Sequence, residues 1–141
     1  MKKRRLIRLS LLAVFLVCML CWYGCSVRYT KQFETLTLDI LADSPSWQRI
    51  LSGAMSERSV SEEHAMKLLS ENHSFVQTIE YLPEYSGIYL VTKQIFPSKE
   101  GVLVSEVEIE PVSRKRNTGI EIEHLGSSEN LFFYRLHYYW D

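Results

Sequence analysis

The residues best suited to chemistry lie in the last quarter of the chain, where charged side chains alternate with apolar ones. Glu121 and Glu123 are separated by one apolar residue, and Arg135 and His137 repeat this spacing further along. Because successive side chains of a strand point to opposite faces, each pair would share one face. Carboxylates beside an imidazole suit proton transfer, cation binding or ion pairing with a basic partner.

In the run LFFYRLHYYWD, Phe133 and Tyr139 lie an even number of residues from Arg135 and His137, so in a strand all four would face the same side. Amphipathic aromatics beside arginine are typical of binding hot spots, while the plainer alternative is cross-strand pairing that stabilises the sheet. We therefore predict a binding surface of six residues: Phe133, Arg135, His137, Tyr139, Glu121 and Glu123. If this strand lies at an edge, it could also accept a partner strand.

More carboxylates continue the alternation at Glu106, Glu108 and Glu110. We expect them on the same wet face as Glu121 and Glu123. One interpretation is a solvated face with cross-strand ion pairs, and the other is an acidic docking surface for a basic partner or a cation. No ligand signature accompanies these residues, so the sequence predicts no metal site.

Catalytic motifs are missing from the sequence. It contains no Gly-x-Ser-x-Gly nucleophile, phosphate-binding loop or dinucleotide fingerprint, and an acid–base pair of Glu123 with His137 is the one catalytic option. All three cysteines precede residue 26, so the rest of the chain has no thiolate. We predict no catalytic residue and no cofactor, and enzymatic activity stays open.

The N-terminal segment predicts a membrane anchor. Five of the 16 basic residues lie within residues 1–8, no acidic residue precedes Glu34, and residues 9–27 are uncharged. About 20 apolar residues span a bilayer as a helix, and a basic flank stays in the cytoplasm. Trp22 and Tyr23 suit the outer interface. We therefore predict a cytoplasmic stub, a single transmembrane segment and an extracytoplasmic domain.

Other interpretations of this segment remain. Gly24-Cys25 resembles the end of the lipobox of bacterial lipoproteins, although Trp22 and Tyr23 depart from that pattern. The resemblance implies a lipid anchor on Cys25. A cleaved secretory signal is a third interpretation, and a cytosolic protein with a buried apolar helix is a fourth.

The formal net charge of −1 averages two unlike parts. Beyond residue 8 the chain carries 11 basic and 17 acidic residues, a balance unsuited to binding nucleic acid. The basic triplet at residues 114–116 lacks interleaved aromatics, so it indicates a solvated turn or a contact with an anionic headgroup. With 46% hydrophobic residues the chain is not wholly disordered.

The elements follow from periodicity. We expect a linker and first element over residues 28–43, with 33–41 extended or, alternatively, continuing as a helix. Helices are expected from Ser44, with Pro45 in the first turn, and from Ser61 to Asn72. Beyond them the period is two. Five strands are predicted: Ser74–Tyr81, Gly87–Phe96, Gly101–Val112, Gly119–Leu125 and Leu131–Trp140.

The predicted fold is therefore α+β, with two helices on a four- to five-stranded antiparallel meander. The helices are expected to cover its apolar face, on which Tyr134 and Leu136 of the last strand lie. Its element order is similar to that of cystatin-like and NTF2-like rolls, by analogy alone. We expect residues 44–141 to form a membrane-tethered domain that binds a protein partner or assembles in a bacterial cell envelope. The alternatives are a small ligand-binding or enzymatic roll and an inhibitor or immunity-type protein.

Overall fold

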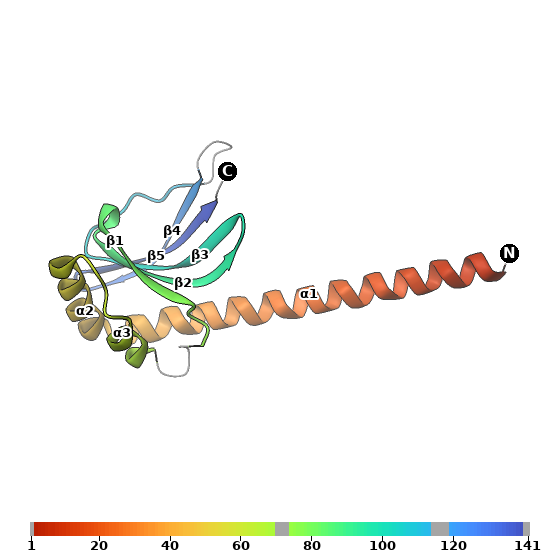
Figure 1. Ribbon diagram of the computed structural model, residues 1–141, viewed down its shortest axis with the longest axis horizontal. Helices are drawn as coiled ribbons and strands as arrows, with labels where there is room; N and C mark the ends of the chain where they lie inside the picture. The colour runs from red at the N-terminus through yellow and green to blue at the C-terminus, as the bar shows by residue number, and fades with distance from the viewer. Residues whose placement is uncertain (1, 70–73, 114–118, 140–141) are drawn as a thin grey trace. The chain divides into compact units, whose positions relative to one another are not determined.

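The computed structural model describes residues 2–69, 74–113 and 119–139, with side chains from residue 6 (Figure 1). Two compact units divide the chain, residues 1–34 and 35–141. Helix α1 (Lys2–Ala42) makes up the first unit and continues into the second. The fold class is α+β, as predicted: a long apolar helix, two further helices and a five-stranded antiparallel sheet.

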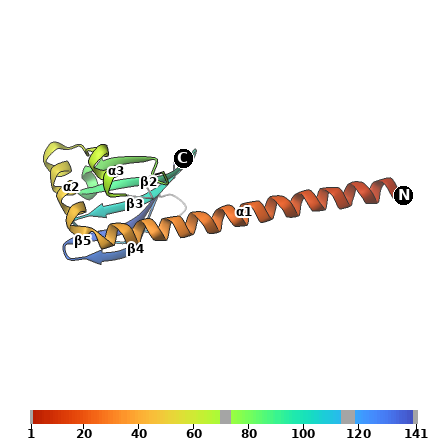
Figure 2. The same cartoon turned by 90° about the horizontal axis from the view of Figure 1, so that it is seen from below.

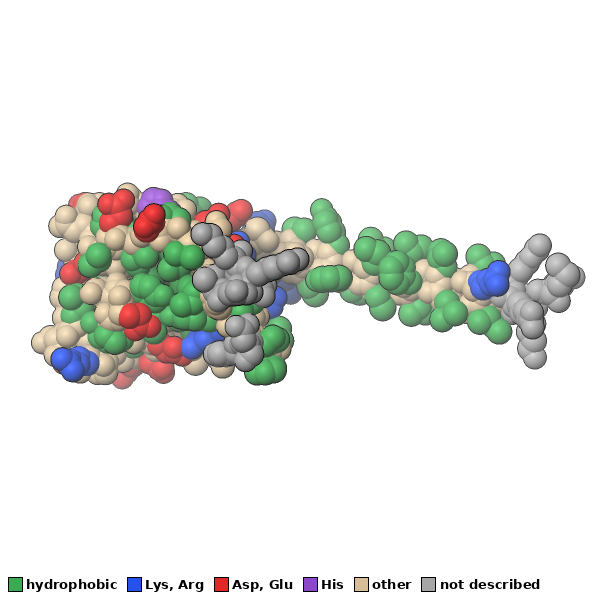
Figure 3. Space-filling model, turned by 90° about the horizontal axis from the view of Figure 1, so that it is seen from above, with side chains coloured by type: hydrophobic (Ala, Val, Ile, Leu, Met, Phe, Trp, Pro, Cys, Tyr) green, Lys and Arg blue, Asp and Glu red, His purple; other side chains and the backbone are tan. Residues whose placement is uncertain are grey.

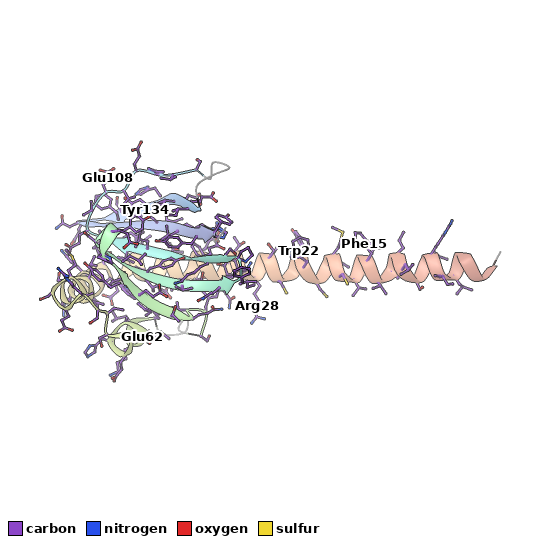
Figure 4. All side chains as sticks on the ribbon, turned by 45° about the horizontal axis from the view of Figure 1, so that its top comes forward. Phe15, Trp22, Arg28, Glu62, Glu108 and Tyr134 are labelled. Carbon is purple, nitrogen blue, oxygen red and sulfur yellow. The ribbon has the colours of Figure 1, made fainter. Side chains whose placement is uncertain are left out.

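The apolar part of α1 is solvent-exposed. Its most apolar 18-residue window has a mean hydropathy of 2.2 and none of that window is buried. Every large apolar side chain between Leu6 and Val27 is at least 50% exposed, and Phe15 and Trp22 project outward (Figure 4). This helix is long and apolar enough to span a membrane or to act as a signal sequence.

The prediction of extended structure over residues 33–41 is wrong, since α1 runs through to Ala42. Within the second unit, Leu36 and Ile40 lie four residues apart and are fully buried. Packing of this helical stripe outweighs the strand preference of the two threonines at positions 35 and 37. The alternative, a helix continuing outward, is the correct one.

The two shorter helices begin close to where the sequence predicts. Helix α2 (Ser44–Glu57) has its N-cap at Asp43, one residue earlier than expected, because Ser44 instead donates its hydroxyl to the carbonyl of Leu41 at 2.8 Å. Helix α3 (Glu62–Leu68) is capped at Ser61 and buries Ala65. The end predicted for it, Asn72, lies outside the described residues.

The strands form one sheet in the order β1-β2-β3-β5-β4. Their bounds are Thr78–Leu82, Gly87–Ile95, Ser98–Ser105, Ile120–Ser128 and Leu131–Tyr139 for β1 to β5, with a short 3-10 helix, η2 (Pro83–Tyr85), between the first two. The predicted meander is wrong at its end, because β5 pairs with both β3 and β4. The last strand is therefore interior rather than at an edge.

The helices cover one face of the sheet. Helices α2 and α3 lie side by side next to the sheet (Figures 1 and 2), where α2 contacts β2 and β3, and α3 contacts β1. A Cβ placed on Gly126 would lie 4.0 Å from Leu41, and Gly126 stands opposite Phe133. We call this the helix-covered face. Its fully buried members include Leu90, Val102 and Phe133.

The opposite face is covered by connecting segments. Its core is a cluster of six buried residues without a helical member: Tyr89, Val91, Leu103, Ile122, Tyr134 and Leu136. Tyr85 and Ile109 pack on it from the connections after β1 and β3. We call this the loop-covered face. The prediction that the helices cover the Tyr134 side is therefore wrong, and both faces are largely buried.

Strand β3 ends at Ser105, seven residues before the predicted Val112. The Ser105 hydroxyl donates to the Tyr85 carbonyl at 2.7 Å and accepts the amide of Val107 at 2.9 Å. This side chain offers the backbone a local turn in place of a ladder. Glu106, Glu108 and Glu110 consequently follow the strand, and Glu108 points away from the sheet (Figure 4).

Candidate functional site

A polar pocket of about 250 Å³ opens on the helix-covered face, toward the end where β2 and β3 join. Five charged or titratable side chains line it: Glu100, Glu121, Glu123, Arg135 and His137. Four of these belong to the predicted binding surface. Glu100 also lines the pocket but was not predicted. It could have been predicted from strand pairing, because it stands opposite His137 in the neighbouring strand.

Strand register brings these residues together. His137 on β5 stands opposite Glu100 on β3 and Glu121 on β4, and Arg135 stands opposite Glu123. Directly opposed side chains in an antiparallel pair lie on the same face with Cβ atoms about 5 Å apart. The predicted parity of β4 and β5 is therefore what assembles the pocket.

An ion pair forms the buried part of the site. The Nε and Nη2 groups of Arg135 both donate to Oε1 of Glu100. Glu100 is only 6% exposed, whereas the Arg135 side chain is 42% exposed. A buried carboxylate is costly unless it is paired, so Arg135 compensates Glu100 and reaches toward solvent. The site then still holds two carboxylates on β4, of which Glu123 is exposed and Glu121 half-buried.

Tyr139 connects the remaining groups. Its ring stacks on that of His137 with centroids 4.0 Å apart. Its hydroxyl lies 2.9 Å from Nδ1 of His137 and 3.4 Å from Oε2 of Glu121. A neutral imidazole that accepts at Nδ1 and a carboxylate can both receive this one proton donor. The Tyr139 hydroxyl therefore links the His137 ring to the Glu121 carboxylate.

The other predicted residues lie elsewhere. Phe133 is on the same face but is fully buried, so it belongs to the core beneath the helices. Cys25 lies in the apolar part of α1 and is exposed. Glu106, Glu108 and Glu110 lie beyond β3 and do not line the polar pocket. The predicted row of five glutamates on one wet face is therefore wrong.

A second hollow of about 500 Å³ lies beside β4 and is almost entirely apolar. Tyr85, Ile109, Val112, Ile120 and Ile122 contribute to it. Figure 3 shows apolar side chains gathered on one surface of the second unit with carboxylates around them. Sequence reasoning missed it because Ile109 and Val112 were assigned to a strand rather than to a covering segment.

Within the described residues, no three or more His, Cys, Asp or Glu side chains are arranged to hold a metal ion. The carboxylates of the pocket nevertheless favour a cationic group, such as an amine or a guanidinium. A comparison with known protein families, curated proteins and solved structures finds no match to this chain.

Proposed function

We propose that this protein is a membrane-tethered domain of a bacterial cell envelope that binds a basic segment of a protein partner in its polar pocket. The observation that carries the proposal is the charge of the pocket: three carboxylates face one guanidinium. Arg135 is already paired with Glu100, which leaves Glu121 and Glu123 to receive a Lys or Arg side chain.

Pocket size supports a side chain rather than a larger ligand. Small-molecule sites are typically clefts of about 300–1,000 Å³ that enclose most of the ligand. The polar pocket, at about 250 Å³, is smaller than this range. A single lysine or arginine side chain from a partner fits such a volume, and the exposed carboxylate of Glu123 would steer its approach.

The N-terminal segment supports the tether and its orientation. The apolar part of α1 is long enough to cross the bilayer, and the basic residues before it favour a cytoplasmic N-terminus. The domain would then work outside the cytoplasm. Lipid attachment at Cys25 is the alternative way of holding the same domain at the membrane.

Site-specific photocrosslinking of the full chain in native membranes tests this proposal. A photoreactive residue replaces Glu123, and the matched control replaces Glu129, an exposed carboxylate in the β4–β5 turn. We expect adducts from position 123 that weaken at high salt and in Glu121→Gln, because the contact is electrostatic. Equal adducts from both positions, or adducts insensitive to salt and to Glu121→Gln, would contradict a basic ligand.

A further inference from the structure

We propose that the turn between β2 and β3 is a second membrane contact, which rests its apolar tip in the headgroup region of the bilayer that holds α1. The tip consists of Ile95, Phe96 and Pro97. This inference depends on the membrane insertion of α1 set out above and does not depend on the polar pocket.

The tip exposes apolar side chains where a hairpin normally places polar ones. Phe96 is 83% exposed and Ile95 is 61% exposed, and the Ser98 hydroxyl closes the turn by donating to the Ile95 carbonyl at 3.3 Å. Turns favour Gly, Asn, Asp and Ser, and single exposed apolar residues are ordinary. Two adjacent exposed apolar residues at the apex of a hairpin indicate a surface that contacts a membrane or another molecule when the protein functions.

The other hairpin of the sheet provides a contrast. The turn between β4 and β5 is made of Glu129 and Asn130, both exposed and polar. Register places the two turns at opposite ends of the strands, since Ser98 pairs with Tyr139 and Ser128 pairs with Leu131. The hairpin turn at one end of this sheet is therefore apolar and the turn at the other end polar, as expected if only one turn meets lipid.

The course of α1 within the second unit agrees with this direction. Leu41, near the end of the helix, lies beside Gly126, which stands toward the polar end of the sheet. The chain thus reaches the polar end after it has left the apolar segment. The apolar tip lies at the opposite end of the sheet from Leu41.

Chain length keeps the domain within reach of the lipid. Seven residues, 28–34, separate the uncharged run from the second unit. Even fully extended, they span at most about 25 Å, which is less than the width of a domain of this size. Tethering makes the contact intramolecular, so two apolar side chains suffice to hold an orientation that a free domain would not keep. Phe side chains of membrane-surface segments bury at the boundary between headgroups and acyl chains.

Fluorescence of a single label in lipid nanodiscs tests the proposal with the full chain. Cys18, Cys21 and Cys25 are replaced by Ala, and an environment-sensitive dye is attached to a new cysteine in Phe96→Cys. The matched control is Asn130→Cys in the polar turn, and Val17→Cys reports insertion of α1 itself. Circular dichroism checks that each variant is folded.

We expect the label at position 96 to shift to shorter wavelength, to be quenched by doxyl-labelled lipid and to resist aqueous iodide. The label at position 130 should show the reverse. The proposal would be overturned if iodide, but not doxyl-labelled lipid, quenched the labels at 96 and 130 alike. It would also be overturned if the label at 96 resisted both iodide and lipid quenching, which would indicate a protein contact. Lipid quenching at 17 but not at 96 rejects only the tip contact, whereas none at 17 rejects the tether as well.

Discussion

The two faces of the sheet carry different charge balances at the same end. On the loop-covered face, Lys99 binds Glu80 at 2.6 Å and lies 5.5 Å from the centre of the Tyr89 ring. On the helix-covered face, Arg135 binds Glu100 while two more carboxylates line the same pocket. A balanced pair is sufficient to hold strands together. The helix-covered face carries two further carboxylates beside its ion pair, and this excess is the reason for proposing the binding site there.

The two faces also differ in what covers them, helices on one and connecting segments on the other. The largest effect that we predict tests this difference. Leu90 on the helix-covered face and Leu103 on the loop-covered face are both fully buried in neighbouring strands. Each change to Ala should cost about 2–5 kcal/mol of unfolding free energy. We expect Leu90→Ala to be the costlier, because helices fill a cavity less readily than a connecting segment. Chemical denaturation measures both, and a larger loss for Leu103→Ala would reverse the comparison.

The two ion pairs should differ in strength. Glu100→Gln leaves Arg135 facing a buried amide and should cost about 1–3 kcal/mol. The matched change Glu80→Gln should cost about 0.2–1 kcal/mol, because the Glu80 side chain is 38% exposed. Equal losses in denaturation would mean that the Glu100 pair is no more structural than the Lys99 pair.

The segment that covers the loop-covered face pairs with β4 through Val112 and Ile122, and it also contacts a side chain that the sequence does not reveal. The backbone amide of Ile109 donates a hydrogen bond to the hydroxyl of Tyr134 at 2.7 Å (Tyr134 in Figure 4). Tyr134→Phe should cost about 1 kcal/mol and speed hydrogen exchange at residues 106–112. Tyr139→Phe serves as the control, since its hydroxyl contacts other side chains. Unchanged exchange at 106–112 would show that apolar packing and the backbone pair of Val112 with Ile122 hold the segment without this hydroxyl.

The smallest effect concerns alkaline pH. Burial, reinforced by Tyr85 and the carboxylates of Glu84 and Glu80, raises the pKa of Tyr138 well above that of a free phenol. Below pH of about 10 both folded and unfolded states keep this proton, and above it only the unfolded state releases it. Stability should therefore fall as pH rises above about 10, and less steeply in Tyr138→Phe. Denaturation curves with the same pH slope in both proteins would contradict the assignment.

Local rules predicted the parts of the fold that depend on neighbours in sequence. Pro45 and the apolar stripe from Trp47 to Ala54 mark α2, and the alternation along β5 puts Arg135 and His137 on one face. Alternation assigns residues to two sides of a strand but does not say what covers each side. Helices were therefore assigned to the wrong face, and Phe133 was expected to be wet.

Long-range pairing accounts for the remaining errors. The turn at Ser105 needs the Tyr85 carbonyl as a partner, and that group lies 20 residues away. The 14 residues between β3 and β4 are long enough to place β4 outside β5, an order that no local pattern encodes. Glu100 joined the site for the same reason, because its partner Arg135 is 35 residues distant.

The interior position of β5 has a consequence for biogenesis. Every other strand of this sheet is synthesised before β5, yet β4 has no strand beside it until β5 pairs between it and β3. While the chain is being made, only β1, β2 and β3 can assemble, and the ion pair of Glu100 cannot form. The sheet therefore stays incomplete until β5 has been synthesised, and export of the domain as proposed above would need such a late-closing chain.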